Sequence, residues 1–557
     1  MEWNIQPGMK LVGRVGLTNR ISGGEEFLPG SHLKFINTAE DDFFKRGSYK
    51  QTYGKSFSVS SDINLNYSHN WDKHILFANL GANIRSSNSE EYIHSAVGFP
   101  NDKMDNIIFA KQYADNSKPT GSESIDREVG ALLAVNYSYD DRYLADFSLR
   151  ASASSQFGSD NRWGTFWSAG LGWNVHNEAF FKDSGVVRQL RLRASMGYTG
   201  SQNFNSYQGM LLYNYFTDDS YLDFIGTYLE GLANSKLKWQ QKFDTNYGID
   251  MNLWGRLNVK FDYYRSVTNN LLTDITTPPS LGFTSYKDNL GKLLNTGYEF
   301  NVNYLVLTRP EDRMSLNVFV AGTSNKNKIK EISNSLSSLT SSQDKEAAKS
   351  NKPFVRFVEG QSLNAIWAVR SKGIDPSSGK EVFVRPDGTL TDTWSALDQV
   401  VCGDTEPKLM GNVGFTFEYK GLSVSFTGLY RIGEYMYNQT LVDKVENAQL
   451  NYNVDKRAYY DAWMKEGDNV QFKSIGAWNK PTQATSRFVQ KLNEFDFSAL
   501  SIGYDFYRFG FVEKCGLERL QLQFNMNDIG KISSVQIERG TSYPFARYCS
   551  FTLNVNF

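Results

Sequence analysis

Histidines are the residues of this sequence best suited to metal or acid–base chemistry, and the chain has five of them: His32, His69, His74, His94 and His176. None stands in an HExxH pair, and the spacing of His69 and His74 does not give a shared helical face. The segment around these two, "NYSHNWDKHI", has the composition of a turn between strands. Neither a GxSxG elbow nor a Walker loop occurs, and acidic pairs such as Asp218–Asp219 are ordinary loop charges. The sequence therefore predicts no catalytic centre, no metal site and no bound cofactor.

Aromatic side chains within long polar stretches offer a second chemistry, which is stacking on sugar rings or on peptide side chains. Four of them are candidates for substrate contact: Tyr213, Tyr215, Phe216 and Trp394. The same rings could instead pack one loop against another or contact a lid above the loops, which is the commoner role for such residues. The sequence leaves both uses open.

Composition and cysteine content restrict the class of protein. Aromatic residues make up 14% of the chain, with 45 glycines and only 13 prolines, which suits long strands joined by tight turns. Cys402, Cys515 and Cys549 are odd in number and widely spaced, so we expect free thiols and not a disulfide framework or a zinc site. A formal net charge of −1 argues against a nucleic-acid partner. No stretch approaches the ~18 apolar residues of a membrane-spanning helix.

A two-residue alternation of apolar and polar side chains recurs along the whole chain, for example over 141–152, 255–266, 297–306, 421–430 and 517–528. These segments are often ten or more residues long. Short connections at 139–141, 252–255, 309–312 and 419–421 alternate with long ones near 200–235, 267–293, 324–409 and 433–489. Long alternating strands, short turns at one rim and long loops at the other predict an all-β transmembrane antiparallel barrel wall of about 16 strands.

The last segment, "RYCSFTLNVNF", continues the alternation to its end. Phe551, Leu553, Val555 and Phe557 fall on one face of a strand, with polar residues between them. We expect Phe557 to end the last strand of the wall.

Several motifs resemble, in order, those of the SusC-like (RagA-like) TonB-dependent outer-membrane transporters of Bacteroidetes. They are "LRASASSQFGSDNRWGTFWSAGLGWNV" (149–175), "LRLRASMGYTGSQNF" (190–204), "LKWQQKFDTNYGIDMNLWGRLNVKFDYYRSVTNNLL" (237–272), "NTGYEF" (295–300), "GIDPSSGK" (373–380) and "YPFARYCSFTLNVNF" (543–557). The resemblance covers about 130–557, and 1–129 fits it less specifically.

The resemblance implies the C-terminal portion of a barrel of about 22 strands. No signal peptide, TonB box or plug is recognisable, so we expect a companion chain or a missing N-terminal part to supply the plug and the remaining strands. The implied function is import of oligosaccharides or peptides across the outer membrane, with a SusD-like lipoprotein as lid and TonB acting through the plug. The final apolar face resembles the signal that the barrel-assembly machinery reads.

Other classes of protein fit parts of the same pattern. A passive outer-membrane porin or a barrel enzyme would require residues 1–557 to close on their own. A surface β-rich glycan-binding protein, built as a sandwich array or a propeller, would be soluble without detergent. A structural surface protein would have no transport role.

Overall fold

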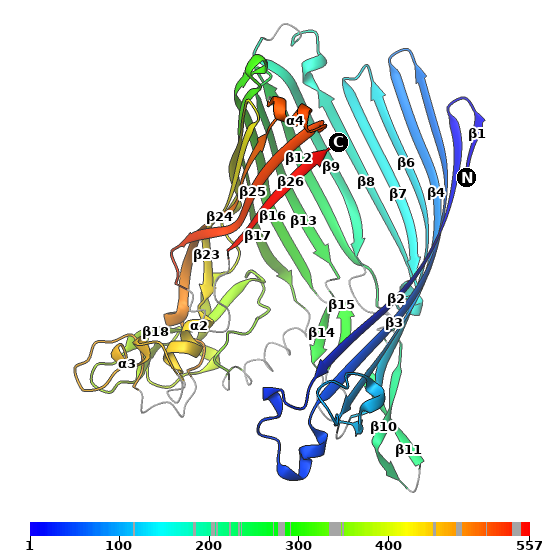
Figure 1. Ribbon diagram of the computed structural model, residues 1–557. Helices are drawn as coiled ribbons and strands as arrows, with labels where there is room; N and C mark the ends of the chain where they lie inside the picture. The colour runs from blue at the N-terminus through cyan, green and yellow to red at the C-terminus, as the bar shows by residue number, and fades with distance from the viewer. Residues whose placement is uncertain are drawn as a thin grey trace.

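The computed structural model describes residues 1–114, 117–181, 185–201, 207, 210–221, 224–231, 234–235, 237–270, 272–276, 285–289, 291–332, 347, 350–448, 453–474, 482–507, 509–536 and 547–557. Strands dominate this part of the chain, and most of them form one curved sheet (Figure 1). No described helix is both long and apolar enough to cross a membrane.

The large sheet has eighteen strands, and neighbouring strands run antiparallel in chain order. Sixteen of them have nine or more residues, whereas β1 and β5 are short. The strands are β1 (Glu2–Gln6), β2 (Met9–Leu28), β3 (Ser48–Trp71), β4 (His74–Val97), β5 (Gln112–Tyr113), β6 (Thr120–Tyr139), β7 (Tyr143–Ser154), β8 (Trp163–Asn174), β9 (Val187–Ser201), β12 (Gln240–Leu253), β13 (Leu257–Asn269), β16 (Lys292–Arg309), β17 (Met314–Glu331), β22 (Leu409–Tyr419), β23 (Leu422–Tyr437), β24 (Val489–Asp505), β25 (Arg519–Ser533) and β26 (Tyr548–Asn556). The predicted all-β antiparallel barrel wall is confirmed.

The sheet curves around an open interior, with β1 and β2 at one edge and β26 at the other (Figure 1). Among the strands that the structure describes, β26 pairs only with β25, and no register joins it to β1 or β2. The wall formed by these residues is therefore not closed on itself.

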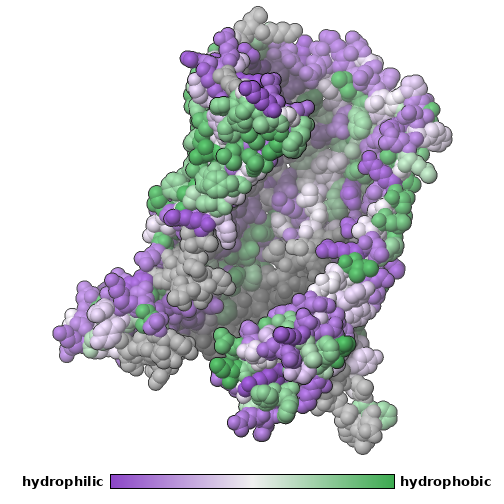
Figure 2. Space-filling view, viewed as in Figure 1, coloured by the Kyte–Doolittle hydropathy of each residue, from purple (hydrophilic) through white to green (hydrophobic). Residues whose placement is uncertain are grey.

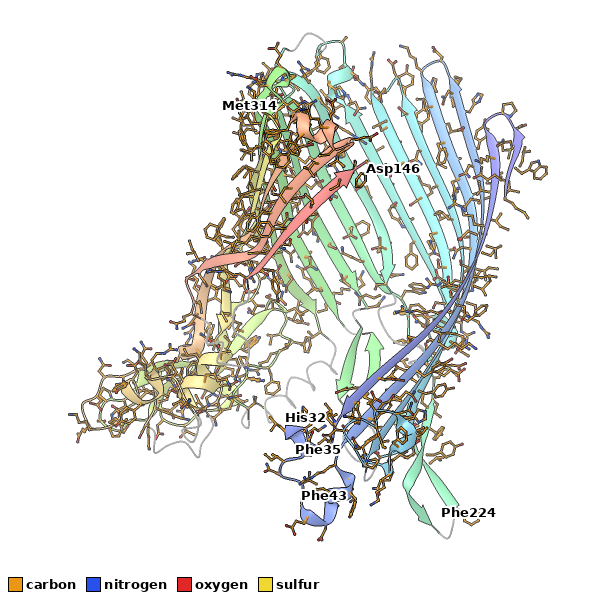
Figure 3. All side chains as sticks on the ribbon, viewed as in Figure 1. His32, Phe35, Phe43, Asp146, Phe224 and Met314 are labelled. Atoms are coloured by element: carbon orange, nitrogen blue, oxygen red, sulfur yellow. The ribbon has the colours of Figure 1, made fainter. Side chains whose placement is uncertain are left out.

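Tight turns join the strands at one end of the sheet, which we call the short-turn rim. Several turn residues have a left-handed backbone, among them Asp72, Asp140, Trp254 and Lys420. Two-residue hairpin turns need such positive φ values, because only then does the turn match the twist of the strands. The predicted short connections are confirmed. Figure 3 places Met314 at this rim.

Longer connections with structure of their own occupy the opposite end, the long-loop rim, where Figure 3 shows His32, Phe35, Phe43 and Phe224. They contain three small sheets: β10 (Leu212–Tyr221) with β11 (Phe224–Gly231), β14 (Leu272–Thr276) with β15 (Ser285–Asn289), and β18 (Ala365–Ile374) with β19 (Glu381–Val384), β20 (Leu390–Thr391) and β21 (Gln399–Asp404). The helices among the described residues are short: η1 (Leu33–Phe35), η2 (Glu40–Lys45), η3 (Ile107–Phe109), η4 (Ser159–Asn161), η5 (Val175–Asn177), η7 (Pro310–Asp312), η8 (Ala396–Asp398), α2 (Gln439–Leu441), η9 (Val442–Glu446), α3 (Arg457–Tyr460), η11 (Ser486–Phe488) and α4 (Gly510–Lys514).

Two of the predicted loop boundaries are wrong. The connections expected from 324 and 433 begin later, because β17 continues to Glu331 and β23 to Tyr437. Two connections at this rim, 29–47 and 98–119, were not among the predicted long loops. In β17, backbone pairing continues over 324–331 with side chains that are mostly polar on both faces, so the alternation stops before the strand does.

The strand registers align apolar side chains in rows, which form one apolar face around the sheet. Leu65 lies opposite Leu80, which lies opposite Leu133 and, through it, Leu149 on β7. On the other side of the sheet a similar row joins Val318, Phe415, Phe426, Leu500 and Met526. Many of these side chains are exposed, for example Leu171 at 68%. Figure 2 shows hydrophobic side chains gathered over the β25 and α4 region. Such an outward face suits hydrocarbon and not water.

Candidate functional site

Polar side chains on the opposite face line the interior of the curved sheet. On β9, β12 and β13, the guanidinium of Arg193 donates through Nε to Asp250 at 2.9 Å and through Nη2 to Asp262 at 3.2 Å. Gly248 lies between the donor and Asp262, and a Cβ there would sit 2.6 Å from Arg193 Nη2. Because Gly248 has no side chain, Arg193 can bridge three strands. These ion pairs join the strands, and the charged groups remain partly exposed to water.

A second charged cluster lies on the strands near the C-terminal edge. Glu494 accepts from Arg431 at 2.7 Å and from Lys531 at 3.1 Å, and its side chain is only 2% exposed. A carboxylate so deeply buried requires these cations, because an unpaired charge away from water is costly. Glu494 thus joins β23, β24 and β25 through paired charges.

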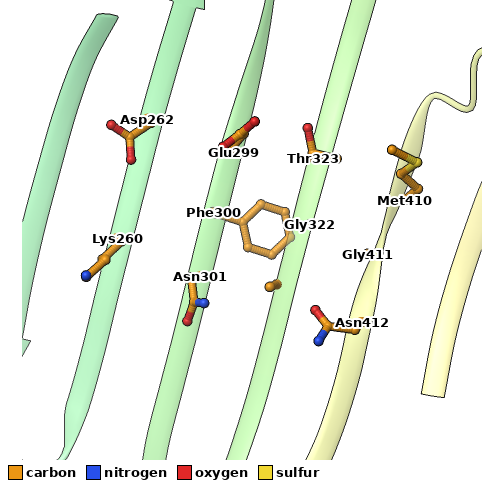
Figure 4. A pocket seen from close by; sticks show the side chains of 11 residues that line it. Lys260, Asp262, Glu299, Phe300, Asn301, Gly322, Thr323, Met410, Gly411 and Asn412 are labelled. Carbon is orange, nitrogen blue, oxygen red and sulfur yellow. The ribbon is translucent and has the colours of Figure 1, made fainter. Parts of the chain in front are cut away.

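Figure 4 shows a shallow pocket on the inner wall, to which β13, β16, β17 and β22 contribute side chains. Its volume is about 390 Å³, and Lys260, Glu299, Asn301, Thr323 and Asn412 are among its lining residues. Neither Lys260 nor Glu299 forms an ion pair with any residue that the structure describes. The pocket presents an ammonium, a carboxylate and amide groups to the interior, and these groups suit contact with a polar ligand.

The loop module, by which we mean the described residues of 350–404 and 438–488, forms a small folded body at the long-loop rim. It has an apolar cluster of its own, made of Leu441, Val442, Val445, Ala448, Ala458, Ala462, Phe472 and Phe488. This cluster lies within the second connection, and a parallel β-bridge between Val369 and Thr485 joins the first connection to it.

A buried ionic network joins the two halves of the loop module. Arg487 donates to Glu381 at 2.9 Å and to Glu446 at 2.6 Å, and it also donates to the carbonyl of Gln471. The side chain of Glu446 has no exposed surface. Burial lowers the pKa of Arg487, but the two carboxylates more than offset this, so its pKa lies above the usual value. The arginine is permanently charged and bridges β19 to the segment that follows α2.

The four aromatic candidates do not form one site. Tyr213 and Tyr215 are exposed on β10, and the side chain of Phe216 lies outside the described residues. Trp394 is half-buried in the loop module, and its indole N–H donates to the carbonyl of Ala484 at 3.1 Å. The β10–β11 hairpin and the loop module lie at different sides of the rim (Figure 1). The indole N–H of Trp394 is therefore occupied by a hydrogen bond within the loop module, whereas the rings of Tyr213 and Tyr215 are exposed to solvent.

The candidate histidines and cysteines have structural surroundings. His69, Trp71 and His74 stack at the short-turn rim, with ring centroids 5.2 Å apart, and His74 Nδ1 lies 2.7 Å from the hydroxyl of Tyr137. These rings lie on the apolar face, where barrels carry an aromatic girdle. The three cysteines are free thiols. Within the described ranges, no group of three or more metal-ligating side chains gathers.

The C-terminal residues lie on the apolar face at the edge of the sheet. Phe551 pairs with Phe524, with ring centroids 5.1 Å apart, and Leu553 pairs with Leu522. Val555 follows in the same row, opposite Leu520. The strand ends at Asn556, one residue earlier than expected, because Phe557 has no register partner.

The sequence alone does not single out the paired charged residues of the interior, namely Arg193, Asp250, Asp262, Arg431 and Glu494. The alternation places each of them on the polar face. It gives no sign of which partner each would meet across the strands.

A family model described as "TonB dependent receptor-like, beta-barrel" matches residues 21–528. A TonB-dependent receptor of Formosa agariphila is 24% identical over 94% of this chain and 53% of its own length. The TonB-dependent receptor SusC of Bacteroides thetaiotaomicron is 26% identical over 67% of this chain and 37% of its own length. The chain thus spans about half the length, or less, of the curated relatives it matches.

Solved structures agree on the fold. A structure of the RagAB peptide transporter superposes with a TM-score of 0.81 at 20% identity, over 96% of this chain and 57% of that one. The RagAB peptide importer in a closed-closed state gives 0.82 at 21% identity, with the same coverage. The matched family is one of transporters and not of enzymes. The chain belongs to the TonB dependent receptor-like β-barrel family and is a protein of the bacterial outer membrane.

Proposed function

We propose that this chain forms the barrel wall and the extracellular loops of a SusC-like importer, which takes up oligosaccharides or peptides across the outer membrane. The observation that carries the proposal is the register of the sheet, which gives one continuous apolar face and one charged, amide-rich face. Such a wall separates hydrocarbon from a wet lumen. A folded loop module at one rim adds a surface that a plain pore would not need.

Further strands and a plug are part of the proposal. The edges at β2 and β26 expose backbone groups, and each unsatisfied group in lipid costs several kcal/mol. We propose that other parts of the same protein, or a companion chain, complete the barrel and supply the plug through which TonB acts. The face of Phe551, Leu553, Val555 and Phe557 is the proposed signal for the barrel-assembly machinery.

The proposed substrate class and the proposed lipoprotein lid are inferred by analogy with the relatives of this chain. One relative is named SusC, and the similar solved structures are titled as a peptide transporter and a peptide importer. A SusD-like lipoprotein would cover the long-loop rim. Tyr213, Tyr215 and Phe216 are the proposed stacking residues there. Trp394 is assigned to loop packing or lid contact, because its indole N–H is already engaged.

The alternatives differ in what they require. A soluble glycan-binding sandwich array or propeller is wrong, because the strands make one continuous curved sheet. A passive porin or a barrel enzyme would have to close from these residues alone, yet β26 pairs only with β25 among the described strands.

Uptake in the native organism tests the proposal. Deleting the gene, or removing TonB, is expected to abolish growth on the transported oligomer. On a gel, the native complex should run as a compact band before boiling and as an unfolded one after it. A lipoprotein should copurify with it. Uptake that persists without TonB would contradict the importer, and a detergent-free monomer would contradict the barrel.

A further inference from the structure

Two adjoining hollows mark the inner wall of β3, β4, β6 and β7. Their volumes are about 400 Å³ and 210 Å³, and Arg85 and Glu128 line both. Gly81 lines the larger hollow, and Gly130 lies beside Asn83, which also lines it. A Cβ on Gly81 would lie 2.6 Å from Oδ1 of Asn64, and a Cβ on Gly130 would lie equally close to an amide oxygen. The glycines therefore keep open a polar hollow with amide groups in its lining.

The carboxylate nearest to Arg85 in the register is already engaged. Glu128 lies directly opposite Arg85, but it accepts from Arg150 Nη2 at 3.0 Å. Arg150 is itself held by Ser152, to which its Nε donates at 2.8 Å. The pair of Arg150 and Glu128 is thus formed within the wall, without Arg85.

Arg85 is exposed to the lumen and forms no ion pair or side-chain hydrogen bond with any residue that the structure describes. On its other side the register partner is Ser60, which carries no charge. The carboxylates of Asp62 and Asp126 also line the hollows, but no hydrogen bond or ion pair between described residues joins either of them to Arg85. A guanidinium has a rigid fork of donors that fits a carboxylate in two places at once. Arg85 therefore presents an unused carboxylate-binding group beside a hollow that has room for a ligand.

The hollow lies toward the outer mouth of the lumen. Arg85 is eleven residues beyond His74, the first residue of β4 at the short-turn rim. At about 3.3 Å per residue this is about 36 Å along the strand, and a barrel-like tilt of about 40° leaves about 28 Å of height. That height is close to the thickness of the hydrocarbon core, about 30 Å. An oligomer that enters from the long-loop rim reaches Arg85 before it reaches the deeper wall.

We propose that Arg85 anchors a carboxylate of the imported oligomer, with the amides beside Gly81 and Gly130 contacting its neighbouring polar groups. The inference rests on the proposed import function and names its substrate class as carboxylate-bearing oligomers. Two sources share this chemistry, acidic peptides and oligosaccharides that contain uronic acid. The experiment has an arm for each source.

Binding to the native protein, purified from outer membranes in detergent, tests the anchor by titration calorimetry. The probes are oligoglutamate and oligogalacturonate, with oligoglutamine and malto-oligosaccharide as their neutral counterparts. The wild-type protein is expected to bind one acidic probe at least about tenfold more tightly than its counterpart, which corresponds to a charge-assisted hydrogen bond of about 1.5 kcal/mol or more. Whichever acidic probe shows the preference identifies the source.

Arg85→Gln is expected to abolish that preference, and Arg85→Lys to keep part of it. Arg20→Gln is the matched control, because Arg20 is another exposed arginine of the same face, on β2, and lines neither hollow. The heat-induced gel shift verifies that each variant is folded. The anchor is refuted if neither acidic probe is preferred, or if Arg20→Gln removes the preference as fully as Arg85→Gln.

Uptake assays separate this inference from the import function. Import that needs TonB but proceeds at the wild-type rate in Arg85→Gln cells would refute the anchor and leave the importer standing. Import without any need for TonB would refute the importer, while calorimetry would still decide whether Arg85 binds carboxylates.

Discussion

Replacing Arg487 by methionine removes the cation that joins the two halves of the loop module. Glu381 and Glu446 would then face each other with little exposed surface, 9% and 0% of their side chains. Lys473 is a second cation close to these carboxylates, but its ammonium donates to Asn447, and burial lowers its pKa. We expect the module to open locally while the barrel wall stays folded.

The expected magnitude follows from the burial of the network. Removing one partner of a buried ion pair costs about 3–5 kcal/mol, because the remaining charge is left without compensation. Since each 1.4 kcal/mol is a tenfold change, local opening should become roughly 100-fold to 4,000-fold more frequent. Replacing all three charged residues by Met or Leu should recover most of the loss, because an apolar core needs no paired charges.

Hydrogen exchange measured by mass spectrometry is the assay, since it reports opening segment by segment. Exchange in β19 and in 439–446 should accelerate together, while β12 and β13 remain protected. Arg385→Met is the matched control within the module. Its side chain is 49% exposed and lies 3.9 Å from Asp398, so it should cost less than about 1 kcal/mol.

A change of less than about threefold in the exchange of the module in Arg487→Met, which is under 1 kcal/mol, would show that the network does not hold the two halves together. The same conclusion would follow if the Arg385 control accelerated exchange as much. Opening of the barrel strands together with the module would show that the two parts are one cooperative unit.

Four further predictions concern the barrel wall, the β10–β11 hairpin and the loop module. Gly411→Val should lower the temperature of the heat-induced gel shift, because any Cβ there meets a backbone carbonyl of β17, whereas Gly23→Val should not, since that position is open. Trp394→Phe should raise local exchange about fivefold, as expected for the loss of one hydrogen bond of about 1 kcal/mol, and leave ligand binding unchanged. Tyr215→Ala should leave local hydrogen exchange unchanged. It should weaken ligand binding, measured by calorimetry, by about three- to tenfold. Hydrogen bonds from the arginine two residues further on lower the pKa of Asp455 from 3.8 to about 2. The stability from this pair is therefore complete above about pH 4 and is lost as the pH falls through about 2. Exchange in the module, followed from about pH 5 down to 2, should lose that acid dependence in Asp455→Asn.

The wall could be predicted because its signal is local. Side chains of a strand alternate between two faces with a period of two, so apolar rows such as that through Leu522 and Phe524 are visible without any knowledge of neighbours. The turn signals "YDD" and "YKG" are local in the same sense. The motif resemblance then supplied the family, which composition and alternation alone did not.

The candidate aromatic site could not be predicted reliably, because a ring in a loop looks the same whether it packs or binds. Trp394 and Tyr215 are both aromatic residues in polar stretches, yet only the indole of Trp394 is engaged within its own module. Burial of a loop residue depends on which distant segment folds over it.

The sequence by itself determined which face of each strand meets hydrocarbon and which meets water, since the side-chain period is a property of one chain segment. Only the tertiary structure decided which charges meet. Arg487 lies 106 residues from Glu381 in the chain, and Arg193 reaches Asp262 only across a strand that carries Gly248 at the crossing. The same holds for Arg85, which has no ion-pair partner among the described residues because Glu128, its neighbour in the register, accepts from Arg150 instead. Partners across a sheet are set by strand register and by long-range folding, and neither is encoded in the alternation of a single strand.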